Sequence, residues 1–292
     1  MKKTNVGAML LAPLLVAPMA LGSADFPAQA AATQHIEYML TDQSLVIIPT
    51  QNQNYADLAG MYLTAAGFQN PDDEPIGIVN IPEYIPFSTL ANTVDIGVKQ
   101  LVEQVVELWD DGNGFNGDDP LYLLGYSQGA VVVSLAEQEF VKAGIPPEAL
   151  HLVMIGDSAS SQGGWLNSFL TSLESWLPEW VVTMVRQNLV SWGIAPPVLG
   201  ATTPDGLYAT DVWSLSGDGW ANWDGGKGLG GMFNDHLWYL GLSQEDIDGA
   251  EVVNPDAVGT YDTVYHMIDS DSVNAFEALW NSFVMAVDFT QW

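Results

Sequence analysis

Residues 125–129, Gly-Tyr-Ser-Gln-Gly, hold one serine between two glycines, after an apolar run and before a stretch without a helix breaker. In a strand-to-helix turn, this Gly-x-Ser-x-Gly pattern is typical of a nucleophile elbow. The glycines remove side chains that would clash as the chain reverses, and the serine is held in a strained backbone with its hydroxyl facing a cleft. We therefore predict that Ser127 is a nucleophile and that the backbone N–H of Gln128 stabilises an oxyanion. The alternative is an ordinary glycine-rich turn whose serine caps the helix.

A serine at its normal pKa needs a base, and in folds with this elbow an acid and then a histidine follow the nucleophile. His35 lies in the N-terminal arm and His151 at the start of an expected strand. His236 lies in a glycine-rich loop that leads into a helix-like segment, where catalytic side chains are often found. His266 lies in "DTVYHMI", which alternates like a strand, so its side chain is expected at a surface or a packed edge. His236 is the favoured base.

Several aspartates could orient this histidine. Asp218 ends the expected strand "VWSLSGD" and precedes His236 in a loop, which favours it as the acid. Asp157 ends "LVMIGD", the strand that follows the nucleophile helix, and is the second candidate, although its carboxylate would also suit the cap of the next turn. Asp211 and Asp224 are weaker candidates.

The segments around these residues alternate between strand and helix patterns. Apolar residues between 91 and 109 recur at steps of three and four, which is typical of a helix with one buried face. The patterns predict strands at 44–50, 121–125, 150–157 and 208–218, and helices at 55–67, 91–109, 130–144 and 272–287. This alternation predicts an α/β fold in three layers, with a mostly parallel sheet covered by helices on both faces.

The first thirty residues have the pattern of a secretory signal. Lys2 and Lys3 precede an apolar stretch, and Ala28-Gln29-Ala30 fits a cleavage site between small residues. We expect a signal peptide at 1–30, one domain at 31–292 and a location outside the cell or in its envelope. Beyond the signal, no uncharged run reaches the roughly 18 residues that a membrane-spanning helix needs, so no transmembrane segment is expected in the mature chain.

The charge of the chain excludes some partners. There are 36 Asp and Glu residues against 6 Lys and Arg, and such a surface repels phosphate backbones, so we expect no binding to nucleic acid. The sequence contains no cysteine, which excludes disulfides and thiolate chemistry. We expect neither a cofactor nor a metal. The segment 110–120 resembles a calcium loop, but Phe115 occupies a ligand position of the EF-hand spacing and no Glu closes it.

An aromatic insertion lies between the later strands, at about 165–206. Within 165–193, five side chains fall on one helical stripe, which predicts a hydrophobic lid above the cleft that binds the acyl part of a substrate; the alternative is that they belong to the core. The five residues of the stripe are Trp165, Phe169, Leu173, Trp176 and Trp180.

Seven segments in a fixed order resemble the PE-PPE domain, an α/β-hydrolase-type serine hydrolase family related to the cutinase-like esterases and found in mycolate-bearing bacteria. They are "VIIPTQNQNY", "NIPEYIP", "VDIGVKQLVEQV", "GYSQGA", "IGDSASSQGG", "HLWY" and "GTYDTVYHMIDS". The resemblance covers most of the mature chain. It implies an α/β-hydrolase fold whose triad is the elbow serine, an aspartate after a late strand and the histidine of an H-x-x-Y motif, which correspond to Ser127, Asp218 and His236.

Two features differ from the family pattern. Where the family has a Pro-Gly-Thr-Gly turn after the first strand, this chain has Pro-Thr-Gln-Asn at 49–52, and we assign the second oxyanion donor to Gln51, with Thr50 as the alternative. No PE or PPE module precedes the domain, so we expect a free-standing secreted enzyme.

Together these observations predict a secreted serine hydrolase that cleaves esters of short- to medium-chain acyl groups through an acyl-enzyme, without a cofactor. The expected partner is an acyl ester or lipid, with contact to the cell-envelope surface as a further expectation. Two alternatives stay open: an acyltransferase that acts on cell-envelope glycolipids, and a non-catalytic envelope-binding protein that kept the fold.

Overall fold

The structure is a computed structural model that describes residues 44–48, 54–68, 77–81, 89–110, 115–223, 225–254, 259 and 261–286. The chain divides into two units, Met1–Glu37 and Tyr38–Trp292, and all described residues belong to the second. The predicted signal peptide at 1–30 lies outside the described residues. In the described part of the chain, no helix is both long and apolar enough to cross a membrane.

A seven-stranded sheet forms the centre of the described unit, in the order β2-β1-β3-β4-β5-β7-β6. All neighbouring strands are parallel except the pair β6 and β7. The strands are β1 (Ser44–Ile48), β2 (Gly77–Asn80), β3 (Leu121–Tyr126), β4 (Leu150–Ile155), β5 (Ala209–Leu215), β6 (Glu251–Val252) and β7 (Thr263–Ile268). The chain passes from β1 to β2 on one side and then to β3 on the other, so a topological switch point lies between β1 and β3, where open α/β sheets bind their ligands.

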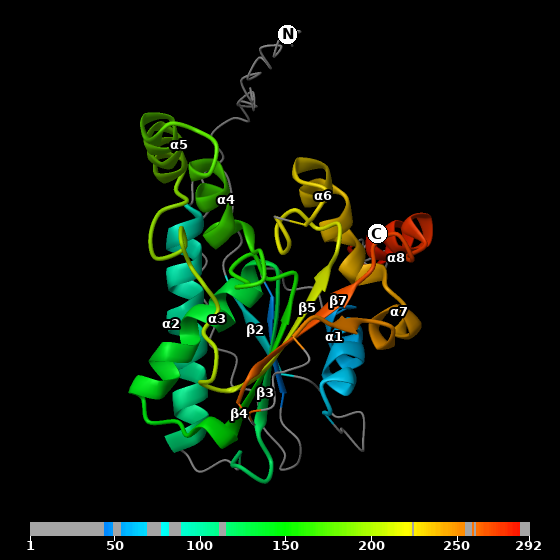
Figure 1. Cartoon of the computed structure of the whole chain (residues 1–292). Helices are drawn as coiled ribbons and strands as arrows, with labels where there is room; N and C mark the ends of the chain where they lie inside the picture. Colours follow the sequence, from blue (N-terminus) through cyan, green and yellow to red (C-terminus); the bar gives the residue numbers. More distant parts are fainter. Residues whose placement is uncertain are drawn as a thin grey trace, which may run out of the picture. The chain divides into compact units, whose positions relative to one another are not determined.

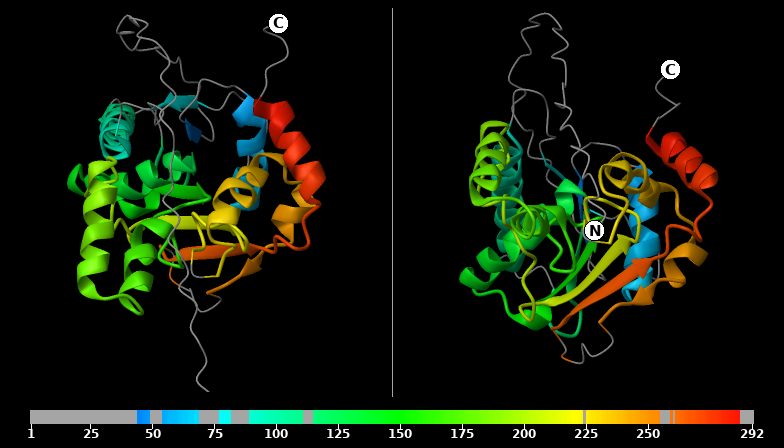
Figure 2. Two further views of the ribbon diagram at one scale, coloured as in Figure 1. Left: turned by 90° about the horizontal axis from the view of Figure 1, so that it is seen from above. Right: turned by 45° about the horizontal axis from the view of Figure 1, so that its top comes forward.

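Helices cover both faces of the sheet, as the sequence predicted. On one face lie α2 (Leu90–Asp110), α3 (Gln128–Lys142), α4 (Trp165–Glu174) and α5 (Glu179–Ser191), and on the other lie α1 (Asn54–Ala65), α7 (Gln244–Asp248) and α8 (Ala275–Ala286) (Figures 1 and 2). The short helices α6 (Leu229–Phe233) and η2 (Asp235–Gly241) follow β5, and η1 (Pro147–Ala149) precedes β4.

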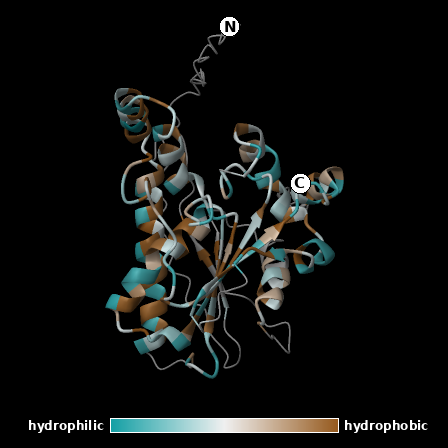
Figure 3. Ribbon diagram, in the orientation of Figure 1, coloured by the Kyte–Doolittle hydropathy of each residue, from teal (hydrophilic) through white to brown (hydrophobic). Residues whose placement is uncertain are grey.

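Alternate residues of the central strands point into two separate cores. In β3, Leu121 and Leu123 pack on the α2 and α3 side, whereas Leu124 and Tyr126 pack on the α1 side. Because successive side chains of a strand point to opposite faces, a strand buried on both faces reads as a continuous apolar run. This is why "LYLL" carries no polar alternation, and the central strands are largely hydrophobic in Figure 3.

Three glycines end their helices by the same local mechanism. Gly67, Gly144 and Gly193 have φ of 93°, 81° and 84°, a left-handed backbone in which glycine has no Cβ to clash. After α1, the N–H of Gly67 donates to the carbonyl of Thr64 and the N–H of Phe68 to that of Leu63, which is a Schellman motif. The predicted helix ends near 67 and 144 are therefore encoded locally.

One sequence expectation about the later elements is wrong. The expected single stripe over 165–193 lies on two helices, α4 and α5, separated at residues 175–178. Pro178 has no N–H to continue a helix and stands at the N-cap of α5, so the helix period cannot run through it. The segment "DTVYHMI", which alternates like a strand in the sequence, contains β7, and β7 pairs with β5 in parallel.

Candidate active site

Ser127 occupies the sharp turn between β3 and α3. Its φ of 53° is the one positive value of a non-glycine residue in the described part of the chain, and its N–H donates to the carbonyl of Ile155 on β4. Such a backbone costs about 1–3 kcal/mol and persists where the surrounding structure imposes it. Although Ser127 is the N-cap residue of α3, its side chain makes no capping hydrogen bond. The alternative of a simple capping serine therefore does not describe this turn.

The two glycines of the pattern allow close backbone approach. A Cβ on Gly125 would lie 2.5 Å from the carbonyl oxygen of Gly129, across the turn. A Cβ on Gly129 would collide with the carbonyl oxygen of Ile47 on β1. Both positions thus exclude any side chain, and the glycines fix the turn that presents Ser127 at the carboxyl end of β3.

The side chains of Ser127, His236 and Asp218 form a hydrogen-bonded chain. His236 Nε2 lies 2.9 Å from Ser127 Oγ, and His236 Nδ1 lies 2.8 Å from Asp218 Oδ2. A carboxylate only accepts, so Nδ1–H donates to Asp218 and leaves Nε2 as the acceptor for the serine hydroxyl. Asp218 is fully buried and His236 nearly so. The structure thus brings together the three residues that the sequence predicted; their catalytic roles remain a prediction.

Asp218 is held by further hydrogen bonds. The hydroxyl of Tyr239 donates to Oδ2 over 3.0 Å, and the N–H of Trp220 donates to Oδ1 over 2.8 Å. Burial and the charge of Asp218 raise the pKa of Tyr239 well above its usual value, so this hydroxyl stays protonated and can donate. The Tyr239 oxygen in turn accepts from the N–H of Leu215 over 2.7 Å, which ties the side chain to the end of β5.

Aromatic rings surround the imidazole of His236. Tyr126 stacks on it at a centroid distance of 5.7 Å, and the Tyr126 hydroxyl donates to the His236 carbonyl over 2.9 Å. Tyr239 meets the imidazole edge-on at 5.8 Å, and Trp220 lies 6.5 Å away. A Cβ on Gly156 would come within 3.1 Å of the imidazole, so glycine also leaves room for it. This packing fixes the ring plane that the two hydrogen bonds require.

Asp157, the second candidate for the acid, has other partners. Its carboxylate accepts from the N–H of Ala159 over 2.9 Å and from the hydroxyl of Thr203 over 2.5 Å, so it caps the turn that follows β4. Burial raises the pKa of Asp157 to about 6, although these two hydrogen bonds lower it. Glu137 is buried nearby, and its pKa is raised well above the usual value by burial and by the charges of Asp157 and Asp205.

His266 and Asp211 pair with each other instead of with the serine. His266 Nε2 lies 2.6 Å from Asp211 Oδ1, and His151 Nε2 lies 2.7 Å from Asp211 Oδ2. Burial alone would raise the pKa of Asp211, but the hydrogen bonds from the two histidines outweigh it and lower that pKa. These three side chains brace β4, β5 and β7. Asp224, the last candidate for the acid, lies outside the described residues.

The two predicted oxyanion donors differ in what the structure describes. Gln128 begins α3 directly after Ser127, so its backbone belongs to the first turn of a 15-residue helix. The partial positive charge at a helix N-terminus favours an anion at this place. Gln51 and Thr50 lie outside the described residues, so the second donor stays a prediction.

The five predicted acyl-binding side chains fall into two groups. Trp165 is buried, stacks on Phe169 at 5.0 Å and meets Trp220 edge-on at 5.2 Å. Phe169 and Leu173 are half-buried and pack against the same core. The contact of Trp165 with Trp220 supports the loop that carries Asp218. Trp176 and Trp180 are 69% and 70% exposed. The expectation that all five form one hydrophobic cover is therefore wrong for the buried part of the stripe.

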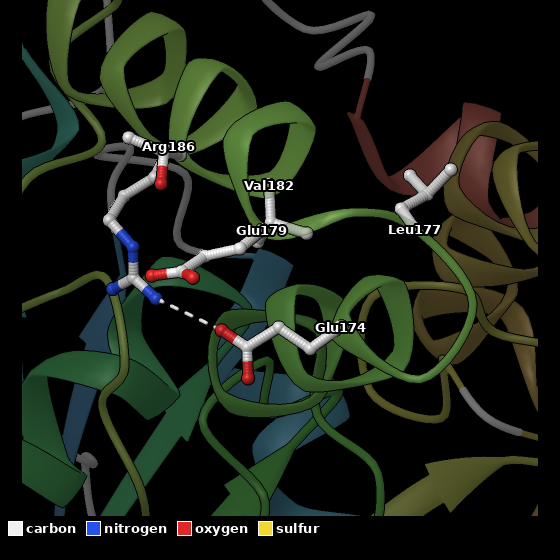
Figure 4. Close-up of a pocket in the computed structure, with 6 residues that line it drawn as sticks. Glu174, Leu177, Glu179, Val182 and Arg186 are labelled. Atoms are coloured by element: carbon white, nitrogen blue, oxygen red, sulfur yellow. Dashed lines mark hydrogen bonds and ion pairs between the residues drawn. The ribbon is translucent and has the colours of Figure 1, made fainter.

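A groove of about 490 Å³ lies between α4 and α5 (Figure 4). Glu174, Glu179 and Arg186 line it together with Leu177 and Val182, and Arg186 points toward Glu174 across it at 3.5 Å. Charged walls suit an acyl chain poorly, since pockets for apolar ligands are lined mainly by apolar side chains. No group of three or more acidic or histidine side chains within the described ranges could hold a metal ion.

Sequence reasoning assigned no role to Tyr239, Tyr126 or Trp220. A signal existed for Tyr239, because it closes the H-x-x-Y motif that His236 opens. Residues three apart in a helical turn lie on the same side, which places the Tyr239 hydroxyl near the partner of His236. Tyr126 and Trp220 act through main-chain atoms and ring contacts, for which the sequence carries no comparable pattern.

The sequence matches the family described as PE-PPE domain over residues 73–223, just over half of the chain. The matched part includes Ser127 and Asp218 and ends before His236. No protein with a curated description matches the sequence.

Three solved structures illustrate what the chain is similar to. Lysin B from Mycobacteriophage D29 is 18% identical, with a TM-score of 0.29 over 42% of this chain, and the alignment spans 49% of lysin B, about half of its length. A cutinase-like protein from Cryptococcus sp. is 17% identical, with a TM-score of 0.36 over 68% of this chain and 87% of that protein. The thermophilic carboxylesterase EstE1 from a metagenomic library is 13% identical, with a TM-score of 0.45 over 86% of this chain and 76% of EstE1.

Proposed function

Because this chain belongs to the PE-PPE domain family and has an α/β-hydrolase-type fold, we propose that it is a serine hydrolase of carboxylic esters. The observation that carries the proposal is the hydrogen-bonded chain from Ser127 Oγ through His236 to the buried Asp218, at 2.9 and 2.8 Å. A nucleophile, a base within hydrogen-bond reach and a third group that orients the base are what activated-serine chemistry requires.

In the first half of the reaction, Ser127 Oγ attacks the ester carbonyl carbon while its proton passes to His236 Nε2. The carbonyl electron pair moves to oxygen, and this oxyanion lies at the N-terminus of α3, where the Gln128 N–H donates to it. When the tetrahedral intermediate collapses, the bond to the alcohol oxygen breaks and the imidazolium returns the proton to that oxygen. Asp218 stabilises the imidazolium and keeps Nδ1 protonated.

In the second half, water attacks the acyl-Ser127 ester and gives one proton to His236 Nε2. The bond from the acyl carbon to Oγ breaks, the proton returns to Oγ, and the carboxylic acid leaves. An alcohol in place of water would make the same site an acyltransferase, so the choice of acceptor depends on which molecule reaches the acyl-enzyme.

We further propose that the acyl group is short to medium in length and that the protein works outside the cell or in its envelope. The exposed indoles of Trp176, between α4 and α5, and Trp180, in the first turn of α5, support the first point, since neither side chain packs into the core. The N-terminal pattern Lys2-Lys3, apolar stretch and Ala-Gln-Ala supports the second.

Labelling with a fluorophosphonate tests the nucleophile directly, because the reagent forms a stable bond only with an activated serine. We expect one adduct, located on Ser127 by mass spectrometry, and no adduct in Ser127→Ala. Ser161→Ala, which changes an exposed serine bonded to Tyr265, is the matched control and should label like the wild type. A protein that takes no label at Ser127 would be the non-catalytic binding protein.

A further inference from the structure

Between residues 276 and 284, helix α8 presents its large apolar side chains to solvent and Ala278 and Ser282 to the protein. The exposed residues follow one another at steps of three, one, three and one, so they form a single stripe along the helix. Phe276 is 80% exposed and Trp280 57%. We call this set the α8 stripe; it consists of Phe276, Leu279, Trp280, Phe283 and Val284. Hydrophobic residues colour much of the α8 ribbon in Figure 3.

The opposite face of α8 is anchored close to the backbone of η2. Ala278 and Ser282 are buried there, and the Ser282 hydroxyl donates to the carbonyl of Leu237 over 2.6 Å. A Cβ on Gly241 would collide with the carbonyl oxygen of Ala278, so helix and segment approach as closely as glycine permits. The stripe is therefore presented on a fixed helix and is not a frayed end that could turn its apolar side inward.

Helix α8 lies beside the segment that carries the candidate base, with the α8 stripe on its outer face. His236 belongs to η2, to which α8 is attached, and its neighbour Leu237 is exposed. Phe233, at the end of α6, is 70% exposed. In Figure 1, α6 and α8 lie at the end of the sheet toward which the arrows of β5 and β7 point, the same end at which Ser127 follows β3.

Charge decides what such a surface can contact. Helix α8 carries one charged residue, Glu277, and no basic one, while the whole chain has a formal net charge of −30. Lys227, the basic residue of the neighbouring loop, is bound to Asp235 at 3.0 Å and lies 3.5 Å from Asp271. An anionic lipid surface would be repelled, whereas an uncharged one accepts Trp and Phe side chains without an electrostatic cost.

From these observations we propose that the α8 stripe docks the protein on the surface of aggregated neutral lipid and so brings the candidate active site to an ester phase. The purpose of the docking, delivery of an ester to the site, rests on the proposed function. The binding to lipid does not, because it requires no turnover. It adds to that function the physical form of the substrate: an uncharged ester aggregate.

A second copy of the chain is a poorer occupant. A helix of 12 residues is about 18 Å long, so its outer face offers roughly 200 Å², well below the ~800 Å² per partner of a stable protein interface. Two copies would also bring together surfaces of the same negative sign. A lipid surface needs no matching shape and takes up a narrow apolar stripe directly.

Flotation with the Ser127→Ala protein tests the docking without hydrolysis of the lipid. The probe is trioleoylglycerol droplets coated with phosphatidylcholine, and the comparison is vesicles of phosphatidylglycerol. We expect binding to the droplets, at least tenfold weaker binding to the vesicles, and at least a tenfold loss of droplet binding on adding Trp280→Ser and Phe283→Ser. Val141→Ser, which changes an exposed apolar residue at the far end of α3, should bind within twofold of its parent.

A second readout does not depend on removing the stripe. Because the chain has no cysteine, Phe276→Cys and Val141→Cys can each carry one environment-sensitive dye. The dye at 276 should shift to the blue on droplets and the dye at 141 should not. The proposal would be overturned if the two dyes shifted equally, or if the variant with Trp280→Ser and Phe283→Ser bound droplets as well as its parent. Tighter binding to phosphatidylglycerol vesicles than to droplets would also overturn it. So would a dimer in the absence of lipid that becomes monomeric in the same serine variant. A failure of the ester hydrolase function would show separately, as a wild-type protein that does not hydrolyse soluble p-nitrophenyl acetate.

Discussion

Tyr239 and His236 share one acceptor, because the Tyr239 hydroxyl and His236 Nδ1 both contact Oδ2 of Asp218, at 3.0 and 2.8 Å. The same tyrosine oxygen accepts from the N–H of Leu215. The carboxylate is thus attached to the end of β5 through a side chain as well as through its own backbone. We infer that Tyr239 is a positioning residue, which acts on the imidazole through Asp218 and touches no substrate.

Tyr239→Phe should therefore lower kcat about tenfold and leave KM nearly unchanged. A hydrogen bond to a charged group contributes roughly 1.5–3 kcal/mol, part of which is expressed in the orientation of the imidazole. The measurement is kcat and KM on a soluble ester, in which a loss confined to kcat marks a positioning role. Tyr208→Phe, which removes a buried tyrosine hydroxyl bonded to the Ile145 carbonyl, is the control. If both variants lose only stability, Tyr239 is structural.

Asp218→Asn should lower kcat by roughly 10³ to 10⁴, the scale lost when a triad imidazole is held in the wrong tautomer. Asp157→Asn should cost far less activity, because its carboxylate contacts Thr203 and Ala159 and not the imidazole. Steady-state kinetics on both variants, with circular dichroism to establish that each is folded, decides between them. The reverse ranking would transfer the role of the acid to Asp157.

Replacing Trp176 and Trp180 with serine should flatten the preference for longer acyl chains. Each methylene buried against apolar side chains contributes about 0.8 kcal/mol, so the ratio of octanoate to acetate hydrolysis should fall by more than tenfold. The melting temperature should change little, because both indoles are exposed. Phe169→Ala is the comparison, because Phe169 is half-buried against Trp165 and Trp223, and it should lower the melting temperature clearly. An equal loss on all chain lengths would mean that the exposed tryptophans do not contact the acyl group.

The buried carboxyl of Asp157 should contribute more stability in acid than at neutral pH. Its pKa is raised from 3.8 to about 6, so the folded state holds this proton more tightly than the unfolded state. The contribution to the free energy of unfolding is fully present below about pH 3.8, falls as the pH rises and is lost above about pH 6; its size is about 3 kcal/mol. Glu137 acts in the same direction.

Urea unfolding of the wild type and Asp157→Asn between pH 4 and 7 measures this contribution as the difference between the two curves. As the pH rises, the free energy of unfolding of the variant should increase relative to that of the wild type, because an amide has no such proton to lose. Asp118→Asn, at an exposed aspartate, should run parallel to the wild type. A constant difference between wild type and Asp157→Asn across this range would contradict the raised pKa.

Features that depend on residues close together in the sequence could be predicted from it. The elbow at Ser127 follows in part from Gly125, where a Cβ would collide within the turn itself, whereas Gly129 is required by the approach of β1. The ends of α1 and α3 follow from Gly67 and Gly144. The parallel sheet with helices on both faces follows from the continuous apolar runs of its central strands. The edge strand β2 was missed, because four residues at a sheet edge carry too short a pattern.

The choice among equivalent candidates depended on the tertiary structure. Asp157, Asp211 and Asp218 all belong to strands or follow them, so the sequence does not distinguish them. The parallel register of β4, β5 and β7 places Asp211 against His151 and His266. Asp218, beyond the end of β5, lies beside His236 instead. The same limit applies to α8, for which the spacing of apolar residues predicts a helix but not which side faces the protein. Aromatic residues would be expected inside, yet the close approach of Gly241 admits only Ala278 and Ser282 and leaves Trp280 in solvent. Periodicity fixes the angle between side chains on one element, whereas the direction of the core is set by the elements packed against it.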